Sequence, residues 1–420
     1  MSDVFNKNVI YNVIGNFVYI GSLWLISVMS VWFLGYEDAG ELGLAMSIAN
    51  IFITIASYNL RNHMVADIDY EHSDEHYYIT RILLTVVSLV CCIAFSIIAG
   101  YSGKVFLIII CFYLYKCEEF ISDILFGVMQ RCNKVYVSGY SMVIKGIAGT
   151  LLFWIVCVTT NSLLTALIAL DVLGLLLILF FDIPISIKIR DGRYNITANC
   201  TKEKCFDLLK KCLPLFLMAL CIGIITSAPR IFFERIYTET EMGYYSSIAN
   251  IAVIFSTGIA CVMMPLITTF SQLYVKGEKK ALLKLALKWL VIILVLGIVC
   301  VVLVKLFGNY VLSLVFDESI VEYSFIFIPL VLLSVAMAVF SELSALMVAM
   351  KMNVKLILPS IFGAIATIAL SYIFVTKYYM NGVVSVQIIS YGIMILMIIG
   401  TILWVNLEKK NENADNNSCL

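Results

Sequence analysis

Residues 214–250, PLFLMALCIGIITSAPRIFFERIYTETEMGYYSSIAN, decide the fold because they join a long apolar run to a copy of an earlier segment. The segment 41–51 (ELGLAMSIANI) recurs at an offset of 200 residues as 241–251 (EMGYYSSIANI). The match predicts a chain built from two duplicated halves. The apolar run also carries Arg230 and Glu234, and charges inside a membrane span usually mark a functional site.

The composition places the chain among helical membrane proteins. Hydrophobic residues make up 62% of the 420 residues and charged residues 13%, and apolar runs of bilayer-spanning length repeat along the chain. The first run, 8–36, is uncharged and far longer than the apolar part of a secretory signal, so we expect an uncleaved first span. The thirteen cysteines show no C-x-x-C pair and are expected to be buried thiols without a disulfide framework.

The apolar runs predict an all-α polytopic protein with about twelve membrane-spanning helices. The predicted spans are 11–34, 42–62, 80–100, 105–129, 140–159, 163–187, 212–236, 242–270, 285–305, 321–350, 355–376 and 381–404. Lysine and arginine gather in the connections on one side, and the positive-inside rule then predicts that both termini are cytoplasmic.

The duplication predicts two pseudo-symmetric six-helix lobes. The expected organisation is an N-terminal lobe (1–190), a cytoplasmic inter-lobe linker (191–211), a C-terminal lobe (212–405) and a polar cytoplasmic tail (406–420). A weaker match of Ser122-Asp123 to Ser341-Glu342 supports the duplication. Internal repeats of this kind are typical of transporters that rock two bundles around a central site.

Polar residues recur at helical spacing in three of the spans. These stripes are Asn50, Thr54, Ser57 and Arg61 in the second span, Lys116, Glu119, Asp123, Gly127 and Gln130 in the fourth, and Gly223, Ser227, Arg230 and Glu234 in the seventh. A charge at the bilayer centre costs about 2.5–3.5 kcal/mol, so the stripes are expected to face water or protein and not lipid.

Two interpretations of the stripes stay open. Lys116 with Glu119, and Arg230 with Glu234, have the spacing of ion pairs along one helix and would then only neutralise each other. Alternatively, the cations line a cavity for an anionic ligand, since the forked donors of arginine match diphosphate oxygens.

Asp171 and Glu342 lie well inside the sixth and tenth spans. Either residue fits a proton or sodium carrier for ion coupling, and either fits a salt-bridge partner, so both roles stay open.

Several other activities are not expected. A metal site at His63, His72 and His76 is less plausible than a solvated polar loop, so neither a metal nor another cofactor is predicted. The basic linker is expected to contact anionic lipid headgroups and not nucleic acid. The sequence contains no Gly-rich phosphate loop and no nucleophile elbow.

The polar positions taken together carry a resemblance to a known family. They are Asn59-Leu60-Arg61 with Asp67, Tyr78 and Arg81, then Lys116-x-x-Glu119-x-x-x-Asp123-x-x-x-Gly127-x-x-Gln130 with Lys145-Gly146, then Pro229-Arg230-x-x-x-Glu234 with Gly243-Tyr244 and Pro265. This pattern resembles the Wzx-type polysaccharide flippases, the polysaccharide-exporter branch of the multidrug/oligosaccharidyl-lipid/polysaccharide (MOP) superfamily. The resemblance covers nearly the whole chain. Related lipid-linked precursor flippases often carry cations in the first span, whereas 8–36 is uncharged here.

The resemblance implies a V-shaped, MATE-like transporter and no enzyme. It implies that undecaprenyl-diphosphate-linked oligosaccharide crosses the bacterial cytoplasmic (inner) membrane by alternating access, for O-antigen, capsule or exopolysaccharide synthesis. The expected substrate-binding residues are Asn50, Arg61, Arg81, Lys116, Glu119, Asp123, Gln130, Lys145, Arg230, Glu234 and Arg235. Membrane lipids, a glycan polymerase and glycosyltransferases are the expected partners.

Two alternatives remain at this stage. A drug or metabolite antiporter of the same superfamily would prefer acidic residues for cationic drugs. A membrane glycan polymerase or ligase would present a large charged outer loop, whereas the predicted outer connections are short.

Overall fold

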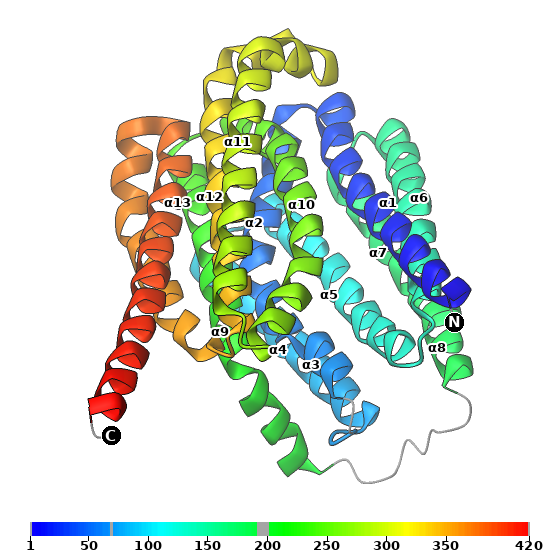
Figure 1. Cartoon of the computed structure of the whole chain (residues 1–420). Coiled ribbons are helices and arrows are strands. Elements are labelled where there is room, and N and C mark those ends of the chain that lie inside the picture. Colours follow the sequence, from blue (N-terminus) through cyan, green and yellow to red (C-terminus); the bar gives the residue numbers. More distant parts are fainter. Residues whose placement is uncertain (1, 68–69, 191–200, 419–420) are drawn as a thin grey trace. The chain divides into compact units, whose positions relative to one another are not determined.

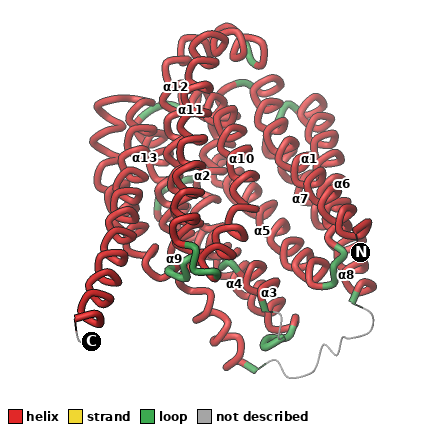
Figure 2. Tube along the Cα trace, in the orientation of Figure 1, coloured by secondary structure: helices red, strands yellow, loops and turns green. Residues whose placement is uncertain are grey.

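The computed structural model describes residues 2–67, 70–190 and 201–418, and every regular element in these ranges is a helix (Figure 2). The first half contains α1 (Ser2–Leu34), α2 (Tyr36–Ser57), α3 (Leu60–Ala66), α4 (Asp74–Ile98), α5 (Gly103–Arg131), α6 (Val135–Thr160), α7 (Leu163–Leu177), the π-helical turn η1 (Ile178–Asp182) and α8 (Ile183–Ile189). The second half contains α9 (Lys202–Ile236), α10 (Glu239–Val275), α11 (Lys279–Val315), the 3-10 helix η2 (Glu318–Ile326), α12 (Phe327–Ala349), the 3-10 helix η3 (Asn353–Leu356) and α13 (Ile357–Ser418).

The predicted all-α polytopic fold is confirmed. Within the described ranges, nine helical segments are long and apolar enough to cross a membrane. The longest, 353–404, contains the predicted spans 355–376 and 381–404, and the non-helical backbone of Tyr379 (φ 55°) separates them. The fourth and eighth predicted spans correspond to α5 and α10, and α5 carries its charged stripe in mid-helix.

The chain folds into two compact units. The first unit contains Met1–Gly223 and Tyr237–Ser247, and the second contains Ile224–Ile236 and Ile248–Leu420. Residues 191–200 of the predicted linker and residues 419–420 of the predicted tail lie outside the described residues. The lobe boundaries at 190 and 212 stay a prediction.

Helices α1 and α6 pack side by side in the first unit (Figure 1). Glycines make this contact close, because a Cβ at Gly15 would lie 2.5 Å from the carbonyl oxygen of Gly139. The contact also brings the polar residues of α1 next to α6, so that both helices border one cavity.

Buried ion pairs fasten the loop between α3 and α4 to neighbouring helices. Arg131 at the end of α5 pairs with Asp67 at 3.1 Å and with Asp74 at 2.6 Å. Arg190, directly after α8, pairs with Asp74 at 2.8 Å and with Glu75 at 2.9 Å. The ends of α4, α5 and α8 are therefore held by charge at this point of the first unit.

Asp67 stays ionised in this network. Burial disfavours its charged form, but the backbone N–H groups of His72 and Glu71, the Tyr77 hydroxyl and the Arg131 guanidinium outweigh this effect and hold the pKa of Asp67 below its usual value. A carboxylate with a lowered pKa stabilises the fold above its unfolded-state pKa, and this contribution is lost as the pH falls through the folded-state pKa.

The two copies of the repeated segment meet in the first unit. The rings of Tyr36 and Tyr244 stack with 3.9 Å between their centroids. A Cβ at Gly40 would lie 1.9 Å from the carbonyl oxygen of Glu239, and a Cβ at Gly243 would lie 1.9 Å from that of Tyr36. The contact of α2 with the beginning of α10 therefore requires glycine at Gly40, directly before the first copy, and at Gly243 in the second.

Substitution of these glycines tests the contact between the repeats. Gly40→Ala and Gly243→Ala should each lower the free energy of unfolding by about 1–3 kcal/mol, because the added methyl group meets backbone atoms that have no room to move. The measurement is thermal or denaturant unfolding of the purified protein in detergent. Gly21→Ala is the matched control: a Cβ there meets nothing within 4 Å, so stability should not fall. If all three variants and wild type unfold with the same free energy, the close approach of α2 to α10 is contradicted.

Candidate functional site

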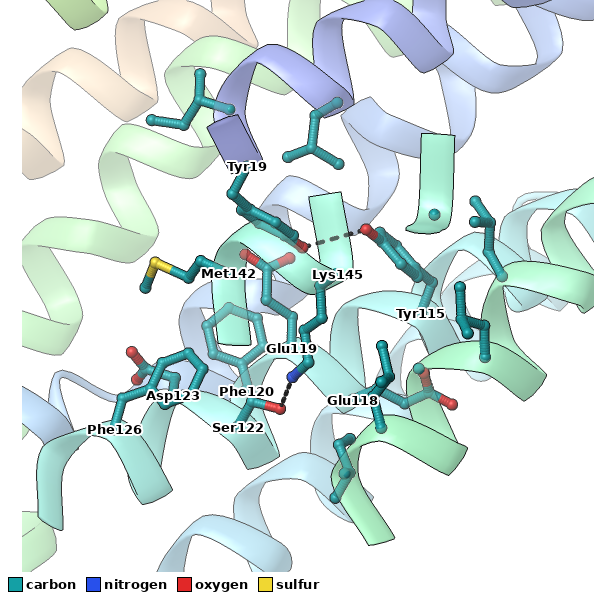
Figure 3. A pocket seen from close by; sticks show the side chains of 18 of the residues that line it. Tyr19, Tyr115, Glu118, Glu119, Phe120, Ser122, Asp123, Phe126, Met142 and Lys145 are labelled. Atoms are coloured by element: carbon teal, nitrogen blue, oxygen red, sulfur yellow. Dashed lines mark hydrogen bonds between the residues drawn. The ribbon is translucent and has the colours of Figure 1, made fainter. Parts of the chain in front are cut away.

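The first unit contains a cavity of about 330 Å³ between α1, α5, α6 and α7 (Figure 3). Aromatic side chains form part of its wall, and they are Tyr19, Tyr115, Phe120 and Phe126. The hydroxyls of Tyr19 and Tyr115 form a hydrogen bond to each other at 3.2 Å (Figure 3). Aliphatic side chains, mostly from α1 and α7, and polar and charged side chains of α3, α5 and α6 complete the lining, so the cavity combines apolar faces with hydrogen-bonding groups.

Asp123 is the centre of the first charged group at the cavity. Its Oδ1 accepts a hydrogen bond from Arg61 Nη1 at 2.8 Å and its Oδ2 accepts one from Arg81 Nη2 at 3.1 Å. Arg61 also donates to Gln130 at 3.3 Å. Arg61 lines the cavity, whereas the Arg81 side chain is fully buried behind it.

Arg81 has a structural reason for its position. Helix α2 ends at Ser57, because Tyr58 and Asn59 adopt left-handed backbone angles (φ 41° and 56°). Its last carbonyl groups lack helical partners, and Arg81 Nη1 donates to the carbonyl oxygens of Ala56 at 2.7 Å and Ser57 at 3.0 Å. The guanidinium therefore caps a helix end and orients Asp123 at once.

Lys116 and Glu119 form the second charged group. Their charged atoms lie 2.6 Å apart, as their spacing of three residues along α5 allows. The Lys116 ammonium also lies 5.4 Å from the ring centroid of Tyr115. For this pair the ion-pair interpretation is the observed one, and Glu119 is the member that lines the cavity.

Lys145 forms the third charged group, and its partner Asp182 is not among the residues predicted from the sequence. Lys145 Nζ donates to Ser122 and lies 2.5 Å from Asp182 Oδ2, and Asp182 is completely buried. Ser141 donates to Asp182 Oδ1 at 2.6 Å. The signal in the sequence was a second carboxylate, after Asp171, inside the apolar span 163–187 and two residues before Pro184.

Glu118 of α5 and Asp171 of α7 are carboxylic acids at the contact between these two helices. Glu118 lies against Gly174, where a Cβ would be 2.0 Å from Glu118 Oε2, and Asp171 is one helical turn before Gly174. One oxygen of each carboxyl group is buried without a hydrogen-bond partner among the described residues. Glu118 also lines the cavity.

The remaining predicted residues lie elsewhere. Asn50 is exposed on α2. Arg230, Glu234 and Arg235 belong to the second unit, where Glu234 and Arg235 approach to 3.8 Å. Glu342 is buried in α12, and neither of its carboxylate oxygens has a hydrogen-bond partner among the described residues.

The three histidines lie at the junction of α3 and α4. His72 Nε2 is 3.2 Å from Asp207, and His63 Nδ1 is 2.9 Å from the Tyr77 hydroxyl. In the part of the chain that the structure describes, no group of three His, Cys, Asp or Glu residues is arranged to hold a metal ion.

The charges at the cavity are of both signs, and all except Glu118 form ion pairs. Arg61 and Lys145 are the cations of its lining, and Glu118, Glu119 and Asp123 are the carboxylates. Arg81, Lys116 and Asp182 stand behind them as counter-ions. An anionic ligand that enters must therefore compete with a resident carboxylate for each lining cation.

Comparison with known proteins agrees with this architecture. Residues 5–274 match the family described as polysaccharide biosynthesis protein. The chain belongs to the polysaccharide biosynthesis protein family. The capsular polysaccharide biosynthesis protein CapF of Staphylococcus aureus is 26% identical over 328 residues, which are 77% of this chain and 80% of CapF. The resemblance stated from the polar positions is therefore confirmed at the level of the family.

Solved structures show that the fold is that of MOP superfamily transporters. An inward-facing multidrug resistance MATE transporter matches with a TM-score of 0.69 and 16% identity, covering 94% of this chain and 98% of its own. The lipid II flippase MurJ in an inward closed conformation also matches with a TM-score of 0.69, with 15% identity over 94% of this chain and 87% of its own. A MOP superfamily transporter from Pyrococcus furiosus matches with a TM-score of 0.63 and 18% identity, covering 96% and 95%.

The role of Arg81 in the site can be tested by stability. Arg81→Ala should lower the free energy of unfolding by about 3–5 kcal/mol, because it removes the donor of Asp123 Oδ2 and of two carbonyl groups and leaves Asp123 with Arg61 alone. Arg81→Lys should fall between Arg81→Ala and wild type, since an ammonium cannot reproduce the fork of the guanidinium. Denaturant unfolding in detergent measures the differences. Lys188→Ala, at an exposed position of α8, is the control and should match wild type. If Arg81→Ala is as stable as wild type, the hydrogen bonds of Arg81 to Ala56, Ser57 and Asp123 contribute nothing to stability.

Proposed function

We propose that this chain is a flippase that carries undecaprenyl-diphosphate-linked oligosaccharide repeat units across the bacterial cytoplasmic membrane. The supporting observation is that a member of a polysaccharide biosynthesis family has the fold of a transporter. The product would serve a surface polysaccharide such as O-antigen, capsule or exopolysaccharide. In this proposal the chain is no enzyme, and both of its termini are cytoplasmic.

The cavity of the first unit supports a glycan diphosphate as ligand. Sugars bind through stacking on flat aromatic faces and through many hydrogen bonds, and Tyr19, Tyr115 and Phe120 with Glu119 offer both. Phosphate oxygens require cations, and Arg61 and Lys145 line the same cavity. The polyprenyl tail needs no protein cavity, because it can stay in the lipid.

Transport would proceed by alternating access of the two compact units. Ligand moves such an equilibrium only through different affinities for the two states. The paired charges suit this requirement, because a ligand phosphate can replace a carboxylate as the partner of a cation. Three residues of the second unit are also proposed to bind substrate, namely Arg230, Glu234 and Arg235. The proposed ion-coupling residues are Asp171 and Glu342. A glycan polymerase and glycosyltransferases are the proposed partners.

A cation antiporter is the second candidate. The carboxylates Glu118, Glu119 and Asp123 line the cavity, and a cationic drug would find counter-ions there. Two of the three, however, already pair with cations. An integral glycan polymerase or ligase is less well supported, because the solved structures that share the fold are described as transporters and a flippase.

Complementation tests the proposed function. Deletion of the gene in its host should remove the surface glycan, and wild type should restore it. Arg61→Ala and Lys145→Ala, at matched expression, should export about tenfold less or worse, since each loses charge-assisted hydrogen bonds worth about 1.5–3 kcal/mol. The readouts are surface glycan and lipid-linked repeat units retained on the cytoplasmic side.

The control for both variants is Lys188→Ala, which removes an exposed lysine and should export like wild type. If both cavity variants export normally, the ligand does not bind through Arg61 and Lys145, and its site lies elsewhere in the protein. If the deletion strain keeps its surface glycan and shows altered drug tolerance, the result contradicts the flippase proposal and supports the antiporter.

A further inference from the structure

The sixth span changes its helical form where it presents Asp182. Helix α7 ends at Leu177, five residues follow as the π-helical turn η1, and α8 continues from Ile183. Pro184 gives a local reason, because it has no N–H to donate to the carbonyl group of Phe180 and its ring crowds that group. Single π-helical turns inside α-helices occur frequently at functional sites.

The turn places the carboxylate behind the cavity wall. Asp182 has no exposed surface and does not line the cavity, whereas Lys145 does. Its two oxygens accept hydrogen bonds from Ser122 at 2.8 Å and Ser141 at 2.6 Å, and Lys145 Nζ lies 2.5 Å from Oδ2. The lysine ammonium is thus the link between the cavity and a carboxylate that no ligand can reach directly.

The other charged groups of the neighbouring helices form no ion pair with Asp182 among the described residues. On α5, Glu119 pairs with Lys116 and Asp123 with two arginines. At the ends of α5, Lys104 pairs with Asp38 and Glu41, and Arg131 pairs with Asp67 and Asp74. Lys188 is exposed on α8, and Arg190 pairs with Asp74 and Glu75. The other carboxyl groups are Asp171 of α7 and Glu118, which lies against Gly174 and on which the charge of Lys145 also acts. Among the described residues, Lys145 is the cation that neutralises Asp182.

We infer that Asp182 is a releasable counter-ion: an anionic ligand takes Lys145 from it, and Asp182 then takes up one proton. The inference rests on the proposed function, because it names how the same cavity would respond to a diphosphate. Lysine suits the exchange, since its ammonium is a point charge on a flexible stem that can turn from Asp182 towards the cavity. Asp182 is a positioning residue in this scheme and never touches the ligand.

The proton follows from the cost of an isolated buried charge. When Lys145 turns away, Asp182 keeps only two hydroxyl donors in an apolar helix bundle. A buried carboxylate without its cation is strongly destabilised, and protonation removes the charge. The balance is one lysine–phosphate contact formed, one lysine–carboxylate contact broken, and one proton moved from water to an Asp182 oxygen. Ligand binding therefore adds a proton to the protein.

Calorimetry can count this proton. The purified full chain in detergent is titrated with undecaprenyl diphosphate at pH 7 in two buffers of different ionisation enthalpy, and the difference in heat gives the protons taken up. Wild type should take up about one proton more than Asp182→Asn, which keeps the shape of the side chain but cannot ionise. Asp182→Asn should also bind at least about fivefold more tightly, because no carboxylate competes for Lys145.

A second measurement needs wild type alone and covers the case in which Asp182→Asn does not fold. If binding takes up one proton, the affinity of wild type should fall by up to about tenfold for each pH unit between pH 7.5 and 9. If the role of Asp182 is purely structural, Asp182→Asn should change stability only. Wild type and Asp182→Asn should then take up the same number of protons, and the affinity of wild type should not depend on pH between 7.5 and 9.

The possible results separate the two proposals. Binding with the same proton uptake in wild type and Asp182→Asn, or with a flat pH dependence, overturns the counter-ion exchange and leaves the flippase proposal in place. Failure of folded wild type to bind undecaprenyl diphosphate at all overturns the flippase proposal and the exchange with it.

Discussion

The cost of burying charge inside a helix bundle governs the first unit. Helix α5 carries Lys116, Glu118, Glu119 and Asp123 along its middle, in a protein whose other spans are almost entirely apolar. Lipid would offer these groups no partner, so they turn towards other helices, and three of them stand at the cavity. The pairs that neutralise Asp123 cross from α5 to α3 and α4, whereas Lys116 and Glu119 pair within α5, and a further pair joins α6 to η1. The groups that hold the helices in place are therefore also the groups that a ligand would meet.

The number and kind of partners separate fixed charges from exchangeable ones. Arg81 is fully buried and donates to a carboxylate and two carbonyl groups, and its planar fork suits three fixed acceptors. Lys145 reaches one carboxylate and one hydroxyl and keeps a side towards the cavity. Loss of one contact would leave Arg81 with strained or unsatisfied neighbours, whereas Lys145 can exchange one anion for another. The chemistry of the two side chains thus matches a structural role for the arginine and a responsive role for the lysine.

The sequence predicts the elements of this fold well and the contacts between them poorly. Apolar length alone gave the spans, and even the gap between 376 and 381 in the last two spans coincides with the break at Tyr379. The pair of Lys116 and Glu119 was predictable because both lie on one helix. Asp123 and Arg81 are 42 residues apart and come together only through the register of α4 against α5, which no local pattern encodes. Asp182 escaped prediction because its partners Ser122, Ser141 and Lys145 lie on other helices, and no spacing within the span 163–187 points to them.

The matching segments of the two halves have similar contacts at one pair of positions and different contacts at another. Ser47 and Ser247 donate to the carbonyl oxygens of Gly43 and Gly243 at 2.8 and 2.7 Å, so both copies use the same internal hydrogen bond. These copies pack on each other, and close backbone approach tolerates little change in either. The weaker matching pair has diverged: Asp123 accepts from two arginines, whereas neither oxygen of the buried Glu342 has a hydrogen-bond partner among the described residues. A contact between the copies constrains both sequences together, while a position that faces different neighbours in each half is free to take on different chemistry.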